Sequence, residues 1–503
     1  MATATLSPDL SAEAPARTVV RSPAAPALCV SRILVQALLI IPFLLINKAG
    51  AVGNIIFFGV VAALVFRGRE WPLKALTLMV LGLICNQWYV PKSQIWTIAR
   101  FSIPPLVLIY SMADMARLNV SLLRRQYYLW HMVFIVVSAI LSIMTGYFVH
   151  IALLKLVNYA IGTTAIFAQV AIQRARRRDL TEWFVTLIVV IVILGFASLP
   201  LGIAYNAKHF GEDAQKYYFN GPFYHSNTMG PFAALISLYL TCVYLFGAYR
   251  NRWICGASIL ALVYFMRLSQ SRTSFAAFLA GLAVVLVLTF LLRRRRQILL
   301  RLNMRRSTLI ACSLALAGAL ALVDVGTGGQ LSKAVVTFIN KGTDKEEVDL
   351  EQVLASRKGR IDMSWENFEQ SPLIGIGFEL STERWFQENA SIFYAPVEKG
   401  FLPTAVLEQS GIIGAIFFVA TLVAMIGYLA STMNVPGLVM FIGFLIVNCG
   451  EVMYFGVAGH GAFGWLLVAA GILLGDFAVY DARQPGYRNR FFPLPNAPGG
   501  SQP

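Results

Sequence analysis

The sequence predicts an all-α fold: a polytopic bundle of about 12 to 14 transmembrane helices with a long, partly helical periplasmic loop. Of the 503 residues, 57% are hydrophobic and only 13% are charged, whereas soluble domains carry roughly 25% charged residues. Long apolar runs recur along the chain, and a helix satisfies its own backbone polar groups in lipid. The basic residues fall in alternate loops, as cytoplasmic loops require. This composition excludes a soluble enzyme.

The apolar runs give the expected helix positions. They cover 33–46, 51–66, 72–89, 95–113, 128–148, 151–172, 183–205, 228–248, 253–268, 274–292, 308–325, 402–429, 437–455 and 461–479. Two features leave the first four runs open to other interpretations. Pro104 and Pro105 interrupt the fourth run, and the first two are short enough for a re-entrant or tilted hairpin.

The net charge of +16, from 41 basic and 25 acidic residues, would alone suggest a nucleic-acid partner. Its distribution excludes that interpretation, because the arginines lie between apolar runs and mark one membrane face. The intervening loops carry few basic residues, so both termini are expected in the cytoplasm. The basic loops contain Arg67, Arg69, Arg117, Arg124, Arg125, Arg174, Arg176 to Arg178, Arg250, Arg252, Arg293 to Arg296, Arg301, Arg305 and Arg306.

The segments between and beyond these runs complete the expected organisation. Residues 1–30 and 481–503 read as disordered cytoplasmic tails, the first without the apolar core of a signal peptide. Transmembrane helices fill 31–325, with a short periplasmic loop at 206–227, and again 402–480. Residues 326–401 form a periplasmic loop far longer than a connection requires.

The long loop is expected to fold. Residues 349–368 have amphipathic helical spacing, through Leu350, Val353, Leu354, Ile361, Trp365 and Phe368, and Gly375 and Gly377 mark a tight turn after Pro372. The loop holds eight basic and twelve acidic residues. Any anion site there must therefore be built by particular side chains.

Several kinds of site are not expected. The six cysteines lie in the tail or in apolar runs, which gives no disulfide framework. His209, His225 and His460 are too scattered for a metal site, and no exterior Asp-x-Asp pair accompanies them. No glycine-rich phosphate loop is present, so neither ATP nor another cofactor is expected.

Four strings stand in order around the long loop: GPFYHSNTMGPFAAL at 221–235, LSQSRTSFAAFLAG at 268–281, GRIDMSWENFEQSPLIGIGF at 359–378 and EKGFLPTAVLEQSGIIGAIFF at 398–418. Together they resemble the O-antigen ligase and polysaccharide polymerase superfamily over roughly 204–418. The resemblance implies a membrane glycosyltransferase that joins glycans from a polyprenyl-diphosphate donor to a glycan or lipid acceptor. The implied location is the periplasmic face of a bacterial inner membrane, in O-antigen, lipopolysaccharide or exopolysaccharide assembly, with other export proteins as possible partners.

Such a donor carries its own leaving group, so catalysis must hold and neutralise the diphosphate. The planar guanidinium of arginine binds phosphate oxygens through paired hydrogen bonds. Arg272, at the exterior end of a run, and Arg360, where the family has its loop arginine, are the predicted diphosphate ligands. The alternatives are a snorkelling or ion-paired Arg272 and a solvated Arg360.

Three further residues are candidate substrate contacts: His225 and Asn227 in the first string, and Arg267 before the second. The alternative for His225 is an ordinary polar residue, and for Arg267 an ion pair with Glu451. Lys155, Asn158, Asn448 and Glu451 lie inside apolar runs, where polar groups are costly and either functional or bundle-lining.

The resemblance also implies a general base. In the ligase branch a histidine stands at the end of the loop, but this chain reads Pro396-Val397-Glu398-Lys399-Gly400 there. Glu398 is the candidate base, and Lys399 either contacts phosphate or forms an ion pair with Glu398. The missing histidine favours polymerisation or transfer of an exopolysaccharide over ligation to lipid A.

The expected reaction is inverting, because one direct displacement reverses the anomeric centre, and metal-independent, because arginines can neutralise the leaving group. Aromatic loop residues either stack on sugars or form the loop's own core: Trp365, Trp385, Phe386 and Tyr394. The competing class is a transporter of polysaccharide or lipid-linked oligosaccharide, and a third is an export scaffold. A long loop on one side argues against a transporter, whose site lies at mid-bilayer.

Overall fold

The structure, a computed structural model, describes residues 28–291 and 350–477, except 92, 211–213, 225, 247–251, 270, 392–398 and 457–458. The two tails, the run at 308–325 and the first part of the long loop lie outside these residues, and so do the predictions made for them.

Helices occupy every predicted run within the described residues. They are α1 (Val30–Leu45), the 3-10 turn η1 (Ile46–Ala49), α2 (Gly50–Val65), α3 (Trp71–Ile84), α4 (Gln94–Arg117), α5 (Gln126–Thr145), α6 (Val149–Ala175), α7 (Thr181–Ser198), α8 (Ser226–Phe246), α9 (Trp253–Leu268), α10 (Arg272–Leu291), α13 (Leu350–Gln370), α14 (Arg384–Asn389), α15 (Leu402–Ser431), α16 (Val435–Asn448) and α17 (His460–Phe477). The all-α polytopic bundle is therefore confirmed. Within the described residues, seven helical segments are long and apolar enough to cross a membrane.

The open questions about the first four runs have structural answers. Helix α4 continues through Pro104 and Pro105 as one helix. The turn η1 joins α1 to α2, with α1 packed on α7 and α2 packed on α3 and α4. The start of α2 lies close against η1, since a Cβ on Gly53 would lie 2.0 Å from the Ile46 carbonyl oxygen. Only glycine permits that close backbone approach.

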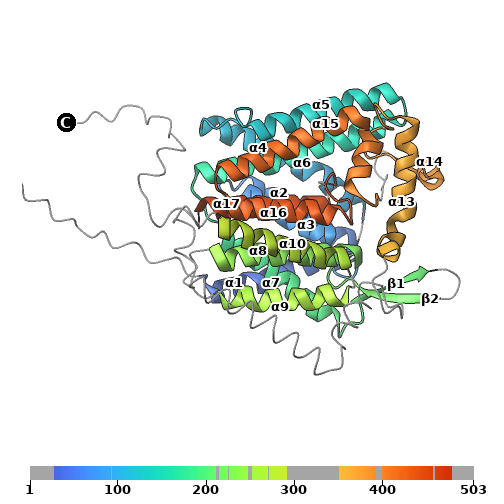
Figure 1. Ribbon diagram of the computed structural model, residues 1–503. Coiled ribbons are helices and arrows are strands. Elements are labelled where there is room, and N and C mark those ends of the chain that lie inside the picture. Colours follow the sequence, from blue (N-terminus) through green and yellow to red (C-terminus); the bar gives the residue numbers. More distant parts are fainter. Residues whose placement is uncertain are drawn as a thin grey trace, which may run out of the picture.

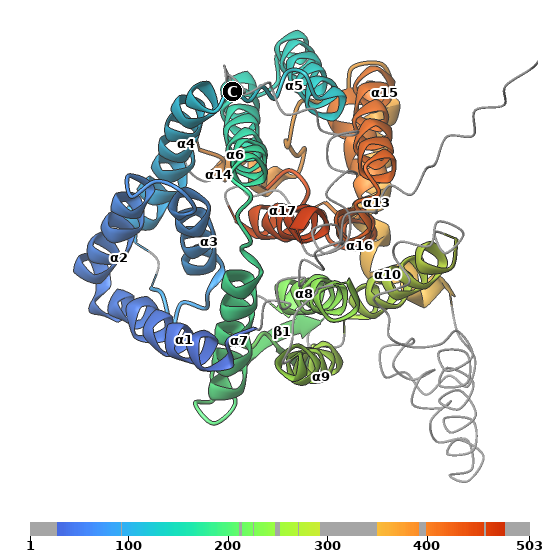
Figure 2. The same cartoon turned by 90° about the vertical axis from the view of Figure 1, so that its left-hand side faces the viewer.

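The helices run side by side, with α16 and α17 near the middle of the bundle (Figure 2). Helix α17 packs on α6 and α16, and α16 packs on α10. Helix α4 packs on α6 at one side of the bundle, while α10 lies at the other side (Figure 2). Apolar side chains fill the spaces between them, with large buried aromatics such as Tyr159 and Tyr454.

The segment after α7 is an antiparallel hairpin, where the sequence predicted only a short loop at 206–227. Strand β1 (Tyr205–Phe210) pairs with β2 (Ala214–Phe219) in the register Tyr205 to Phe219. The chain after β2 then pairs with the end of α3, because the Asn86 amide donates to the Pro222 carbonyl at 2.7 Å. These backbone partners lie far away in the sequence, which is why the apolar pattern did not indicate them.

One end of the bundle carries β1, β2, α13 and α14 (Figure 1). The opposite end carries arginines from the basic loops, held in ion pairs: Arg174 with Asp476 at 2.7 Å and Arg176 with Asp114 at 2.9 Å. The basic loops and the segments β1, β2, α13 and α14 thus lie at opposite ends of the helices.

The predicted loop helix is α13, but its buried face differs from the amphipathic prediction. Trp365 is exposed, whereas Ser364 and Asn367 are buried. Polar contacts rather than apolar packing therefore hold this part of α13 against α15.

Candidate functional site

The turn between α13 and α14, residues 371–383 and called the cap turn here, packs against a break in α15. At Gly411 the backbone leaves the helical region, with φ 58° and ψ −166°. The Ile376 amide donates to the Glu408 carbonyl at 2.8 Å, and the Ile412 amide donates to the Pro372 carbonyl at 2.8 Å. The cap turn thereby pairs with backbone groups on both sides of the break, which would be costly to leave unpaired in a buried position.

Two glycines make this docking possible. A Cβ on Gly411 would lie 2.3 Å from the Leu373 carbonyl carbon, and one on Gly375 would lie 2.5 Å from the Ser410 nitrogen. Both residues also have positive φ, 58° and 70°. Glycine is thus required at both positions by close approach as well as by conformation.

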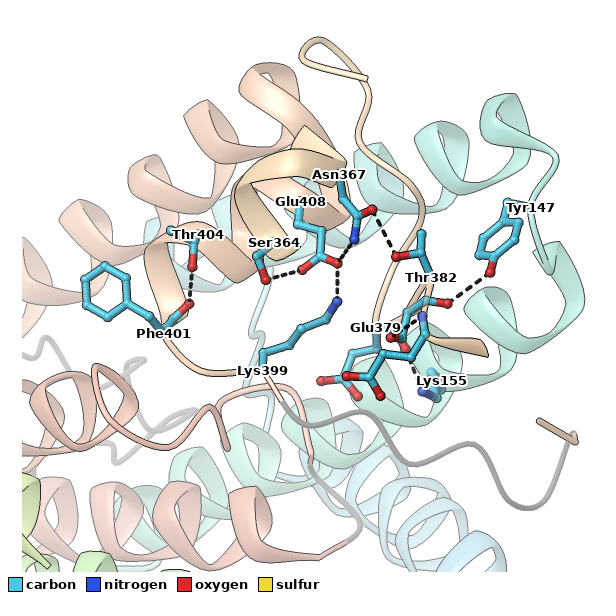
Figure 3. Close-up of polar contacts among 12 residues, drawn as sticks. Tyr147, Lys155, Ser364, Asn367, Glu379, Thr382, Lys399, Phe401, Thr404 and Glu408 are labelled. Atoms are coloured by element: carbon cyan, nitrogen blue, oxygen red, sulfur yellow. Dashed lines mark hydrogen bonds and ion pairs between the residues drawn. The ribbon is translucent and has the colours of Figure 1, made fainter. Parts of the chain in front are cut away.

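Glu408, next to the break, is the centre of a buried polar network (Figure 3). Its carboxylate accepts hydrogen bonds from Ser364 Oγ at 2.6 Å and from Asn367 Nδ2 at 2.7 Å. Lys399 Nζ lies 2.5 Å from the same carboxylate. Asn367 in turn accepts a hydrogen bond from Thr382 Oγ1 at 3.0 Å. The network joins α13, the cap turn and α15. Ser364 and Asn367 are each more than 40 residues away from Glu408 in the sequence.

Lys399 is almost completely buried, with 2% of its side chain exposed. Burial lowers the pKa of its ammonium, and the Glu408 carboxylate opposes the shift. The partner of Lys399 among the described residues is Glu408, and the ion pair with Glu398 stays a prediction. Glu398 itself lies outside the described residues.

A second charged cluster lies where Glu379 of the cap turn meets α6. Lys155, on α6, donates to the Glu379 carbonyl at 2.6 Å. The Glu379 side chain interacts electrostatically with Lys155 and Arg100, and Lys155 also interacts with Lys399. Figure 3 shows Lys155 beside Glu379, a short way from the Glu408 network. One buried cation, Lys399, and two half-buried cations, Arg100 and Lys155, thus gather beneath α13, the cap turn and α14, which together are called the cap here.

The cap is fixed to α5 and α6 around this cluster. Tyr147 Oη donates to the Ser381 carbonyl at 2.9 Å, and the Phe378 amide donates to Ser142 Oγ at 3.0 Å. Phe386 is buried against Phe148, with ring centroids 5.8 Å apart. Phe386 therefore packs on the connection between α5 and α6, while Trp365 stays exposed. The side chain of Trp385 and the whole of Tyr394 lie outside the part of the chain that the structure describes.

Arg360 lies on the face of α13 that the network uses, since it precedes Ser364 by one helical turn and Asn367 by two. Arg272 begins α10. The residues on either side of Arg272 pack closely against glycines of other segments. A Cβ on Gly230 would lie 2.3 Å from Ser271 Cβ, and a Cβ on Gly450 would lie 2.2 Å from Thr273 Cγ2. Arg272 thus lies where α8, α10 and the segment after α16 meet.

The structure groups only some of the predicted site residues. Lys399 belongs to the Glu408 network, and Arg360 shares a face of α13 with Ser364 and Asn367 of that network. Arg272 begins α10, which lies on the other side of α16 from α17 (Figure 2). Arg267 is exposed in the last turn of α9. His225 and the side chain of Asn227 lie outside the described part of the chain. Next to them, Thr228 Oγ1 and His460 Nε2 lie 3.3 Å apart.

Sequence reasoning missed three charged residues of the site: Arg100, Glu379 and Glu408. Arg100 and Glu408 lie inside helices that are otherwise apolar. An ionisable residue in such a helix is by default a functional candidate, so a scan for charges within apolar runs would have found both. No comparable pattern marks Glu379, whose position depends on the cap turn.

Comparison with known families matches part of the chain. Residues 257–419 match the family model described as O-antigen ligase. No curated protein matches the chain. The matched residues include the strings at 268–281, 359–378 and 398–418, so the resemblance to the O-antigen ligase and polymerase superfamily is confirmed there. With the apolar helices, the match supports a multi-pass membrane protein with a glycan ligase or polymerase role.

Proposed function

We propose that this protein polymerises or ligates polysaccharide repeat units from a polyprenyl-diphosphate donor at the periplasmic face of a bacterial inner membrane. The main support is the gathering of buried polar and cationic side chains, around Lys399 and Glu408, beneath one cap. These two residues lie in the part of the chain that matches the O-antigen ligase family. A charged network at one end of the bundle suits chemistry on a lipid headgroup better than transport, which needs a site at mid-bilayer.

In the proposed reaction an acceptor hydroxyl oxygen attacks the anomeric carbon of the donor. The bond from that carbon to the diphosphate oxygen breaks, and the electron pair leaves with polyprenyl diphosphate. Arg272 and Arg360 bind the diphosphate and stabilise its developing charge. No metal or cofactor is needed, because the donor bond supplies the driving force, and the single displacement inverts the anomeric centre.

Glu398 takes the proton of the acceptor hydroxyl in this proposal. Lys399 is its neighbour in the chain and is fixed by Glu408 at 2.5 Å. The buried ion pair therefore holds the end of the loop in place, and Lys399 positions Glu398. His225, Asn227 and Arg267 are proposed as further contacts to the glycan or the lipid headgroup.

Product sizing after incubation with a defined lipid-linked repeat unit tests the proposal. The purified chain in lipid vesicles should release free polyprenyl diphosphate and form a ladder for polymerisation, or a single shifted product for ligation. Arg272→Ala and Arg360→Ala should lose transfer. Arg384→Ala is the matched control, since Arg384 is a cap arginine that is 90% exposed. Movement of unmodified substrate across the vesicle would instead identify a transporter.

A further inference from the structure

An apolar groove opens on the side of the bundle between α4 and α6. It encloses about 250 Å³ and is lined by Phe101, Pro105, Leu154, Val157, Asn158 and Ile161. Val157 is 52% exposed, so the groove faces outward, where lipid surrounds a transmembrane bundle. Its shape and lining suit a hydrocarbon chain that enters sideways from the bilayer.

Two cations lie beside the capped end of this groove, although neither side chain is among those that line it. Arg100 precedes Phe101 on α4, and Lys155 follows Leu154 on α6. Each lies six residues into its helix, about 9 Å from the capped end of the bundle at 1.5 Å per residue. The lining residues continue to Pro105 and Ile161, roughly 17 Å along the helices. The groove therefore runs from a cationic mouth towards the middle of the membrane.

The charge at this mouth is incompletely balanced among the described residues. Glu379 interacts electrostatically with both Arg100 and Lys155, and Lys399 adds a repulsive interaction with Lys155. Arg100 Nε is buried without a hydrogen-bond partner. Glu379 has a left-handed backbone, with φ 53°, which is unfavourable for a side chain of its kind. One carboxylate held in a strained turn thus faces two cations where a ligand oxyanion would bind.

From this juxtaposition we propose that the α4–α6 groove binds a polyprenyl-diphosphate lipid, with the isoprenoid chain along the groove and the diphosphate at Arg100 and Lys155. The inference rests on the proposed function and deepens it. A flexible, branched hydrocarbon fits an apolar groove, and a multiply charged headgroup fits two cations better than a singly charged one.

The site is distinct from the one proposed around Arg272. Between α6 and α10 lie α17 and α16 (Figure 2), and the three steps from helix to helix, at 8–10 Å each, add up to about 24–30 Å. A single diphosphate is only a few ångströms long, so it cannot contact Lys155 and Arg272 together. Two lipid positions on either side of α16 and α17 suit a reaction in which donor and acceptor are both lipid-linked. This arrangement favours polymerisation.

The test measures binding of a long-chain polyprenyl diphosphate to the full chain in nanodiscs of a neutral phospholipid, by native mass spectrometry. Wild type should hold two lipids per chain. Arg100→Gln with Lys155→Gln should weaken one of them by at least about tenfold, because two charge-assisted contacts are lost. Arg272→Ala should remove the other. Arg117→Gln, at the opposite end of α4, is the matched control and should retain both.

A second variant separates binding from folding. Val157→Trp fills the groove and leaves both cations in place, and it should also remove one lipid. Val136→Trp, at an equally exposed position on α5, should not. Normal binding by both the double variant and Val157→Trp would overturn the inference, as would equal competition by phosphatidylglycerol. Failure of the proposed function looks different, since wild type would then bind lipid and form no product.

Discussion

Glu408 offers the sharpest test of how the cap is held on the bundle. Its carboxylate is fully buried and accepts hydrogen bonds from Ser364 and Asn367 while it pairs with Lys399 at 2.5 Å. Replacing one member of a buried pair leaves the other charge uncompensated, which costs about 3–5 kcal/mol. Glu408→Gln keeps the side-chain volume and one hydrogen-bond acceptor, so we expect the free energy of unfolding to fall by about 3 kcal/mol.

Lys399→Met should cost a similar amount, because it leaves the Glu408 carboxylate buried. The double variant removes both charges, so its loss should fall short of the sum by about 2 kcal/mol. The exposed pair of Arg384 and Glu388, 2.7 Å apart, is the control. Glu388→Gln should change stability by no more than about 1 kcal/mol.

The assay is reversible unfolding of each variant in lipid bicelles, with glycan transfer measured on the folded fraction. Transfer should fall in Glu408→Gln, because the cap and the end of the loop lose their anchor. A Glu408→Gln variant as stable as Glu388→Gln would refute the anchoring role of the Glu408–Lys399 pair. Strict additivity of the two single-variant losses in the double variant would refute it as well.

Two other expectations concern the same region. Gly411→Ala should destabilise the chain by about 1–3 kcal/mol, because its Cβ would meet the Leu373 backbone at a positive φ. Gly427→Ala on the same helix, with open space around it, should be neutral or slightly stabilising. The two variants are compared by their unfolding midpoints, and equal midpoints would contradict the docking of the cap turn. Burial lowers the pKa of Lys399 in the folded chain, so the unfolded chain binds more protons between the two pKa values. The free energy of unfolding should therefore rise with pH below the ordinary pKa of lysine. Lys399→Met should lose this rise, and an unchanged pH profile would count against it.

The bundle was predictable because its information is local. An apolar run of sufficient length predicts a helix whatever its neighbours are, and α9 begins and ends as predicted, at Trp253 and Leu268. The hairpin of β1 and β2 was not predictable in this way, since its pairing and its contact with the end of α3 depend on distant backbone groups.

The site was predictable only in part because its partners are distant in sequence. The loop helix was expected, but its buried face was not, since Ser364 and Asn367 face inward to meet Glu408, more than 40 residues away. Helical periodicity treats both as solvent-facing positions. Lys155 was noted as a costly charge in an apolar run, yet only the cap turn reveals its contact with Glu379.

The central claim is that arginines at the capped end hold the diphosphate of a lipid-linked glycan during transfer. Its most direct test counts polyprenyl diphosphate released per glycosidic bond formed, for wild type, Arg272→Ala, Arg360→Ala and the exposed control Arg384→Ala. Wild type and the control should release one diphosphate per bond, and Arg272→Ala and Arg360→Ala should lose both products. Full release and bond formation by either of those two variants would contradict it.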